Sequence, residues 1–170
     1  MRVIVDGYNL IRNSPDLSRI ERVDLGAGRQ ELLRRLGQYQ RRKGHQVLVV
    51  FDAAESIYSS RRQERIGGVS VTFSRKGETA DEVIKGLASS GREGVVIVTS
   101  DRELASFAER QGAYTISVVE FEQRMLALPA FPEKDIQEQE EPDYSPRKKK
   151  GAARKLSKAE RRRQARLLHL

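Results

Sequence analysis

Short apolar runs alternate along most of the chain with longer segments that mix apolar and polar residues. Residues 3–5 are three β-branched residues in a row, which is typical of a strand buried on both faces in a parallel sheet. Residues 46–51 and 94–99 show the same pattern, residues 69–73 alternate apolar and polar positions, and residues 113–116 form a shorter run. Five strands are therefore predicted.

The segments between these runs predict helices. Residues 28–43 carry leucines on one stripe, and Gly44 stands where a helix C-terminal cap is preferred. Thr79 and Glu82 have the spacing of a capping box, which predicts a helix with Asp81 in its first turn. We also expect helices over 102–111 and 119–128, a sharp turn at Gly7, a turn with a short helix over 12–27, and a loop with a short helix over 53–68. Strands that alternate with helices form parallel βαβ units, so the predicted fold class is α/β, a three-layer αβα fold with a central parallel sheet of about five strands.

The last quarter of the chain has a different composition. Residues 129–146 hold four of the five prolines and six acids, and they have too little apolar material to fold. Residues 147–170 hold eleven Lys or Arg residues against one acid. The predicted organisation is a folded domain over 1–128, an acidic linker over 129–146, and a basic tail over 147–170 that is disordered or becomes helical when bound.

The charge distribution and the residue types present restrict the classes of function that the chain can have. The net charge of +8 sits mainly in the basic tail, which indicates a polyanionic partner such as RNA, DNA or a ribosome. With no cysteine, and with His45 and His169 as the only histidines, disulfides, thiolate zinc sites and catalysis by a histidine pair are excluded. The first predicted strand follows Met1 and Arg2 directly, and no apolar run reaches the roughly 18 residues of a membrane span. We expect a cytoplasmic protein with neither a leader nor a membrane partner.

Acidic residues end three of the predicted strands. Asp6, Asp52 and Asp101 should share one edge of the sheet, where open α/β folds bind their ligands, and residues 78–82 open a helix beside it. Clustered carboxylates raise one another's pKa values unless a cation compensates. Oxygen ligands of this kind suit Mg²⁺ or Mn²⁺ and phosphoryl chemistry. A strand-end Asp is also a common helix N-cap, a role that Asp101 fits, although capping alone requires no convergence of several acids.

Four motifs in order resemble the NYN domain family, in particular its bacterial YacP-like branch, a relative of the PIN-domain nucleases. They are DGYN at 6–9, FD at 51–52, GETADEVI at 77–84 and VTSD at 98–101, and the resemblance covers about residues 1–128. It implies a PIN-like parallel α/β sheet with strands 1 and 4 central, and a metal-dependent endoribonuclease. The YacP-like branch is associated with ribosome-linked mRNA cleavage, which implies mRNA and the ribosome as partners.

The resemblance also implies roles for single residues. Asp6, Asp81 and Asp101 match the acids that bind Mg²⁺ or Mn²⁺, and Asn9 matches the residue that orients Asp6 or a metal-bound water. Asp52 and Glu78 match motif positions too, and Ser100 lies next to Asp101, where it could contact a metal-bound water or a phosphate. These last three are secondary candidates.

Basic and aromatic residues near the acidic edge are candidates for RNA contact. A polyanion needs a positive rim to approach an acidic centre, whereas the alternative for each cation is a solvated surface. Tyr8 and Tyr58 could stack on unpaired bases, and packing against the protein is the alternative for Tyr8. The candidates are Tyr8, Arg12, Arg61, Arg62, Arg75, Lys76 and Arg102, with Arg65 as a further rim residue, and Arg147, Lys148, Lys149, Lys150, Arg161, Arg162 and Arg163 in the basic tail.

The sequence thus favours a Mg²⁺- or Mn²⁺-dependent endoribonuclease that cleaves single-stranded RNA by attack of water on a phosphodiester. The alternative is a non-catalytic RNA- or ribosome-binding protein with a relic acidic pocket. A phosphatase that forms an aspartyl phosphate is disfavoured, because it needs an Asp-x-Asp turn and Tyr8 and Ala54 stand at the second position after the two strand-end acids.

Overall fold

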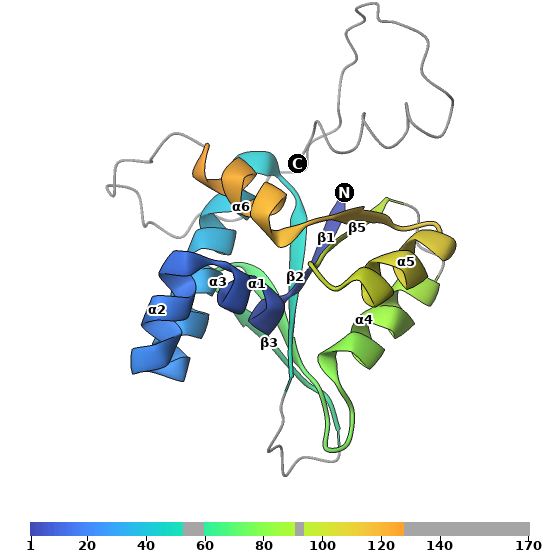
Figure 1. Cartoon of the computed structure of the whole chain (residues 1–170), viewed down its shortest axis with the longest axis horizontal. Helices are drawn as coiled ribbons and strands as arrows, with labels where there is room; N and C mark the ends of the chain where they lie inside the picture. The colour runs from blue at the N-terminus through green and yellow to red at the C-terminus, as the bar shows by residue number, and fades with distance from the viewer. Residues whose placement is uncertain (53–59, 91–93, 128–170) are drawn as a thin grey trace, which may run out of the picture.

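A six-stranded sheet lies between two layers of helices in the computed structural model, which describes residues 1–52, 60–90 and 94–127 (Figure 1). The strands are β1 (Arg2–Asp6), β2 (Gln46–Phe51), β3 (Arg62–Ile66), β4 (Val69–Phe73), β5 (Val95–Val98) and β6 (Tyr114–Ile116). The helices are α1 (Gly7–Asn13), α2 (Pro15–Val23), α3 (Leu25–Lys43), α4 (Ala80–Ser89), α5 (Arg102–Arg110) and α6 (Val118–Leu126). The expected linker over 129–146, the basic tail over 147–170 and Tyr58 lie outside the described residues. None of the helices within these ranges is long and apolar enough to cross a membrane.

The strand order is β3-β4-β2-β1-β5-β6. Strand β1 pairs in parallel with β2 and β5, β2 with β4, and β5 with β6, which confirms the five predicted parallel strands. Strand β1 lies in the interior of the sheet beside β5, the fourth predicted strand, as the family resemblance implied. The carboxyl ends of β2, β1 and β5 therefore lie next to one another at one edge of the sheet.

Strand β3 corrects the expectation of a loop and short helix over 53–68, of which 53–59 lie outside the described residues. It pairs antiparallel with β4, so the sheet has six strands rather than about five. The two strands are joined by Gly67 and Gly68, both at positive φ (58° and 86°), as a tight two-residue hairpin requires. The strand was missed because it is an edge strand, and the charged residues that protect such an edge from further pairing remove the apolar signal.

Two helix starts also differ from the prediction. Helix α1 begins at Gly7, directly after β1, where a turn was expected. Helix α3 begins at Leu25, three residues before the predicted start, because Asp24 caps it by accepting hydrogen bonds from two backbone N–H groups. The C-terminal cap at Gly44 (φ 64°) and the capping box of Thr79 and Glu82 are confirmed.

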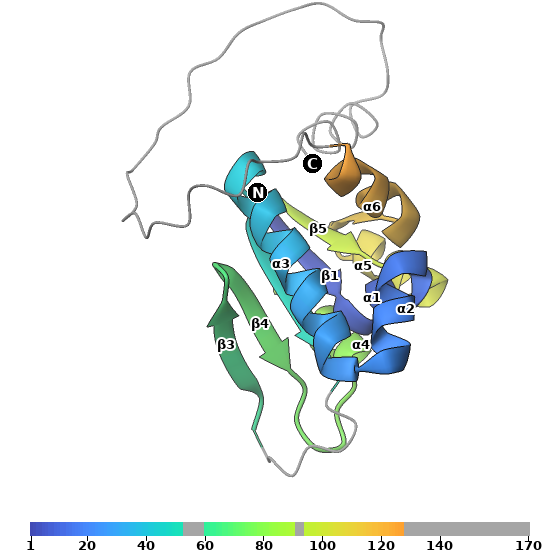
Figure 2. The same ribbon diagram turned by 90° about the vertical axis from the view of Figure 1, so that its left-hand side faces the viewer.

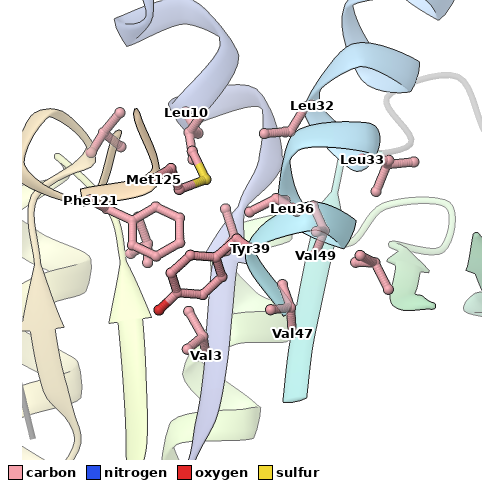
Figure 3. Packing of buried hydrophobic residues seen from close by; sticks show 14 of the residues in the cluster. Val3, Leu10, Leu32, Leu33, Leu36, Tyr39, Val47, Val49, Phe121 and Met125 are labelled. Atoms are coloured by element: carbon pink, nitrogen blue, oxygen red, sulfur yellow. The ribbon is translucent and has the colours of Figure 1, made fainter. Parts of the chain in front are cut away.

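The sheet separates two hydrophobic cores. Helices α1, α2, α3 and α6 cover one face, and α4 and α5 cover the other (Figures 1 and 2). In the first core the rings of Tyr39 and Phe121 meet edge to face at 5.1 Å (Figure 3). Alternation along β1 sends Val3 and Val5 into this core and Ile4 into the second one. The same alternation places Asp6 on the face that α4 and α5 cover.

Candidate active site

Asp6 is both the last residue of β1 and the N-cap of α1, so the strand passes into the helix without a loop. Its Oδ1 accepts a hydrogen bond from the backbone N–H of Asn9 at 3.1 Å. Gly7 makes this junction possible, because a Cβ atom there would lie 2.4 Å from Cε1 of the buried Phe51 ring. Close packing against β2, rather than an unusual backbone angle, explains the glycine of the DGYN motif.

Asn9 connects the end of β1 to the loop after β5. Its backbone N–H binds Asp6, and its side-chain Oδ1 accepts the backbone N–H of Ser100 at 2.9 Å. The Ser100 hydroxyl accepts the backbone N–H of Val118, at the start of α6, at 3.3 Å. These bonds hold Asp6 beside the segment that carries Asp101.

Asp101 is the N-cap of α5. Its Oδ1 accepts the backbone N–H groups of Glu103 and Leu104 at 2.7 and 3.1 Å, so the capping role foreseen for this residue is confirmed. Its own backbone N–H donates to Oγ1 of the buried Thr99 at 3.1 Å. Only Oδ1 takes part in capping, and Oδ2 of this exposed residue makes no hydrogen bond to the described part of the chain.

Asp81 lies in the first turn of α4, as predicted, and its charge acts on Asp6 at the end of β1. Its Oδ2 forms an ion pair with Nζ of Lys85 at 2.8 Å, and Lys85 also reaches Glu103 of α5 at 3.4 Å. Lys85 is a part of this site that sequence reasoning missed. The signal was available, because residues spaced i and i+4 on a helix are neighbours.

The charges of Asp81 and Asp101 act electrostatically on Asp6. The pKa of Asp6 is raised from 3.8 to about 6, mainly by burial and also by the negative charges of Asp81 and Asp101. The hydrogen bond from Asn9 and the positive charge of Arg12 lower this pKa without cancelling the rise. Asp81, Asp101 and Arg12 are therefore near enough to Asp6 for their charges to shift its pKa.

The possible ligands of these three aspartates are hard carboxylate oxygens, which are the ligands that Mg²⁺ and Mn²⁺ prefer. The positions of the side chains are less favourable for binding a divalent cation. Within 1–52, 60–90 and 94–127, no three His, Cys, Asp or Glu residues lie close enough together to enclose one ion. The ion pair with Lys85 occupies one oxygen of Asp81, and capping occupies one oxygen each of Asp6 and Asp101.

Asp52 and Glu78 have other partners. Asp52 Oδ1 accepts the hydroxyl of Ser74 at 3.1 Å, which ties it to the end of β4. Glu78 binds the Arg61 guanidinium through both oxygens, at 2.6 and 2.9 Å, and lies 3.8 Å from Arg75. These contacts, led by the hydrogen bond from Arg61, lower the pKa of Glu78 to about 2. The charges that shift Asp6 do not include these two acids.

The candidate RNA-binding residues of the domain fall into two groups. Tyr8 packs edge to face on Phe51 at 5.1 Å, with the Arg12 guanidinium over its ring at 5.4 Å, and Arg102 is exposed at the start of α5. Arg61, Arg62, Arg75 and Lys76 lie on or beside the β3–β4 hairpin, where Arg62 pairs with Glu64. The tail residues Arg147, Lys148, Lys149, Lys150, Arg161, Arg162 and Arg163 lie outside the described part of the chain.

A mostly parallel sheet lies between two helical layers, with acids at the carboxyl ends of its central strands, and the family match gives this α/β fold a nuclease-like, RNA-related class. The chain belongs to the YacP-like NYN domain family, whose model matches residues 3–167. That match extends past residue 128 into the expected linker and basic tail.

Relatives from Bacillus subtilis support the assignment. The chain is 34% identical over 88 residues to the uncharacterized protein YacP of strain 168, which is 52% of this chain and 51% of that protein. The match thus spans about half the length of this curated relative. Two crystal structures of Rae1 (YacP) are also similar, each with 74% of both chains covered. A tryptophan-to-leucine mutant has a TM-score of 0.62 at 29% identity, and the other structure has 0.58 at 32% identity.

Proposed function

We propose that this protein is a Mg²⁺- or Mn²⁺-dependent endoribonuclease that cleaves single-stranded RNA by attack of water on a phosphodiester. The observation that carries the proposal is the bridge through Asn9, which binds Asp6 with its backbone and the neighbour of Asp101 with its side chain. A side chain that joins two strand ends in this way supports a shared acidic site. Capping of two separate helices would need no such connection.

Asp6, Asp81 and Asp101 are the residues that would hold the ion. When bound, a divalent cation supplies an activated water and offsets negative charge on the phosphodiester. Asn9 keeps Asp6 in place, and Arg12 reduces the repulsion that a phosphate meets as it approaches. Asp52, Glu78 and Ser100 stay secondary candidates that position the surrounding loops.

RNA is the proposed partner, and mRNA on the ribosome is the proposed setting. Arg12 and Arg102 flank the acidic site, and Tyr8 offers an aromatic surface for a base. The basic tail would add sequence-independent attraction to RNA or to a ribosome. Cytoplasmic location follows from this proposal and stays a prediction.

The proposal is tested with the full chain, labelled single-stranded RNA, and Mn²⁺ with or without chelator. Asp6→Asn and Asp101→Asn should each slow cleavage by about two orders of magnitude or more, because each removes a charge that acts on the reaction. Both variants should fold, since Asn is also a good N-cap. Asp16→Asn, an exposed acid in the first turn of α2, is the matched control and should cleave normally. Wild-type rates in both site variants would refute the assignment.

The non-catalytic alternative is favoured by the absence, among the described residues, of three acids that enclose one ion. Calorimetric titration with Mn²⁺ separates the two functions. Binding that Asp6→Asn weakens supports the nuclease, whereas no detectable binding supports a protein that only binds RNA or the ribosome. Parallel cleavage assays on free mRNA and on translating ribosomes test the proposed setting.

A further inference from the structure

We propose that a groove beside the β3–β4 hairpin binds the sugar-phosphate backbone of the RNA strand where it extends away from the acidic site. This inference rests on the proposed function and names a second part of the substrate path. The groove has a volume of about 350 Å³ and lies between the hairpin and α4. In Figure 2 the hairpin extends past the edge of the helical layers.

The two faces of the hairpin differ in chemistry. Val69 and Val71 of β4 enter the core beneath α3. The register pairs Gln63 with Thr72 and Arg65 with Ser70, so these four polar residues line the other face. Gln63, Arg65 and Ser70 are exposed on this face and Thr72 is buried, so the outer part of the polar face is available to a ligand.

The walls of the groove suit a polyanion. Arg2, Arg61 and Arg65 line it, and Glu64, the one acid among the described residues that line it, forms an ion pair with Arg62 at 2.5 Å. Arg65 is held by a hydrogen bond of 3.1 Å from its Nε to the Gly68 carbonyl. A guanidinium fixed through one nitrogen can still donate to a phosphate from the others.

One lining residue of the groove, Arg61, is held by Glu78, which is close in sequence to the acidic site. Glu78 fixes Arg61 at the end of the groove near the start of α4, three residues before Asp81. Among the described residues no aromatic side chain lines the groove, so contacts to phosphate and ribose would supply the affinity of these residues for RNA. We therefore expect little dependence on RNA sequence in this part of the path.

Fluorescence anisotropy in chelator, where cleavage is suppressed, measures binding separately from catalysis. Labelled oligouridines of about 4 and about 12 nucleotides span the site sizes of single-strand grooves. Arg65→Glu should weaken binding of the longer RNA about tenfold and reduce the slope of log affinity against log salt by about one. Binding of the shorter RNA should change much less. Gln63→Glu, on the same strand, is a second variant that should weaken binding of the longer RNA less than Arg65→Glu, because it adds one negative charge and removes no cation.

Arg22→Glu on α2 is the matched control, because it makes the same charge change on the opposite side of the sheet. The proposed RNA-binding role of the groove would be refuted if Arg22→Glu weakened RNA binding as much as Arg65→Glu. It would also be refuted if both groove variants bound the longer RNA as tightly as the wild type. Failure of the nuclease proposal has a different signature, namely cleavage that neither Asp6→Asn nor chelator affects. The two proposals can therefore fail independently.

Discussion

Asp6 combines a structural role with a chemical one in a single side chain. Its Oδ1 caps α1, and its charge lies in a half-buried position where the charges of Asp81 and Asp101 act on it. A buried carboxylate near like charges makes the folded state less stable whenever it is ionised. The protein therefore carries an unfavourable charge where the proposed chemistry needs one.

This conflict predicts a pH-dependent gain in stability for Asp6→Asn. The pKa is 3.8 ordinarily and about 6 in the fold, so between these values the folded chain retains a proton that the unfolded chain releases. Stability of the wild type should fall as the pH rises from about 4 to about 6. Urea unfolding at pH 7.5 should show Asp6→Asn more stable by about 1–3 kcal/mol, with little difference at pH 4. Asp16→Asn should change neither value, and an Asp6→Asn variant less stable at both pH values would contradict the electrostatic explanation.

Lys85 gives a second prediction for a single side chain. It holds Asp81 at 2.8 Å and would compete with a cation for that carboxylate. Lys85→Gln should therefore tighten Mn²⁺ binding about threefold to tenfold in calorimetry, because it removes a nearby positive charge. Lys43→Gln, in the last turn of α3, is the control and should leave the affinity unchanged. Weaker Mn²⁺ binding by Lys85→Gln would show that the lysine supports the site instead.

Among the elements, the β1–α1 junction depends on close packing at Gly7. The Phe51 ring that fills the space of a Cβ atom is fully buried, between Tyr8 at 5.1 Å and Phe73 at 5.7 Å. It cannot move aside without disturbing both neighbours. The position of Asp6 is therefore linked to the packing of β2.

Gly7→Ala should destabilise the fold by about 1–3 kcal/mol, the usual cost of forcing extra atoms into a packed core. Gly86→Ala on α4 is the matched control, since nothing lies within 4 Å of its added Cβ, and it should be neutral or slightly stabilising. Thermal unfolding measures both. The double variant Gly7→Ala with Phe51→Leu should lose less stability than the two single changes added together, because leucine leaves room for the methyl group. Strict additivity would exclude the proposed contact.

The elements also show which features could be predicted from the sequence. Strands β1, β2 and β5 were predictable because burial on both faces leaves continuous apolar runs. Strand β3 was not, because an edge strand packs one face at most and here reads RQERI. The Gly67-Gly68 pair was its one local signal, and a hairpin turn is the structure that such a pair favours.

At the scale of the whole molecule, the sequence predicted which acids follow strands. It did not predict which of these acids would lie near one another in the fold. Asp6 and Asp101 share an edge because β1 and β5 are neighbours, an order that apolar patterning does not specify. Asp52 follows a strand in the same way and Glu78 precedes the helix that carries Asp81, yet these two acids bind Ser74 and Arg61 toward the hairpin side. Only the three-dimensional arrangement separates these two sets of acids.

The direct passage from β1 into α1 has a consequence for how this family can vary. One residue inserted between Asp6 and Gly7 would turn every later side chain of the helix by about 100° around its axis. Asn9 would then point away from Ser100, and the connection to β5 would be lost. Length variation among related chains should therefore be tolerated at the tip of the β3–β4 hairpin and be absent at this junction.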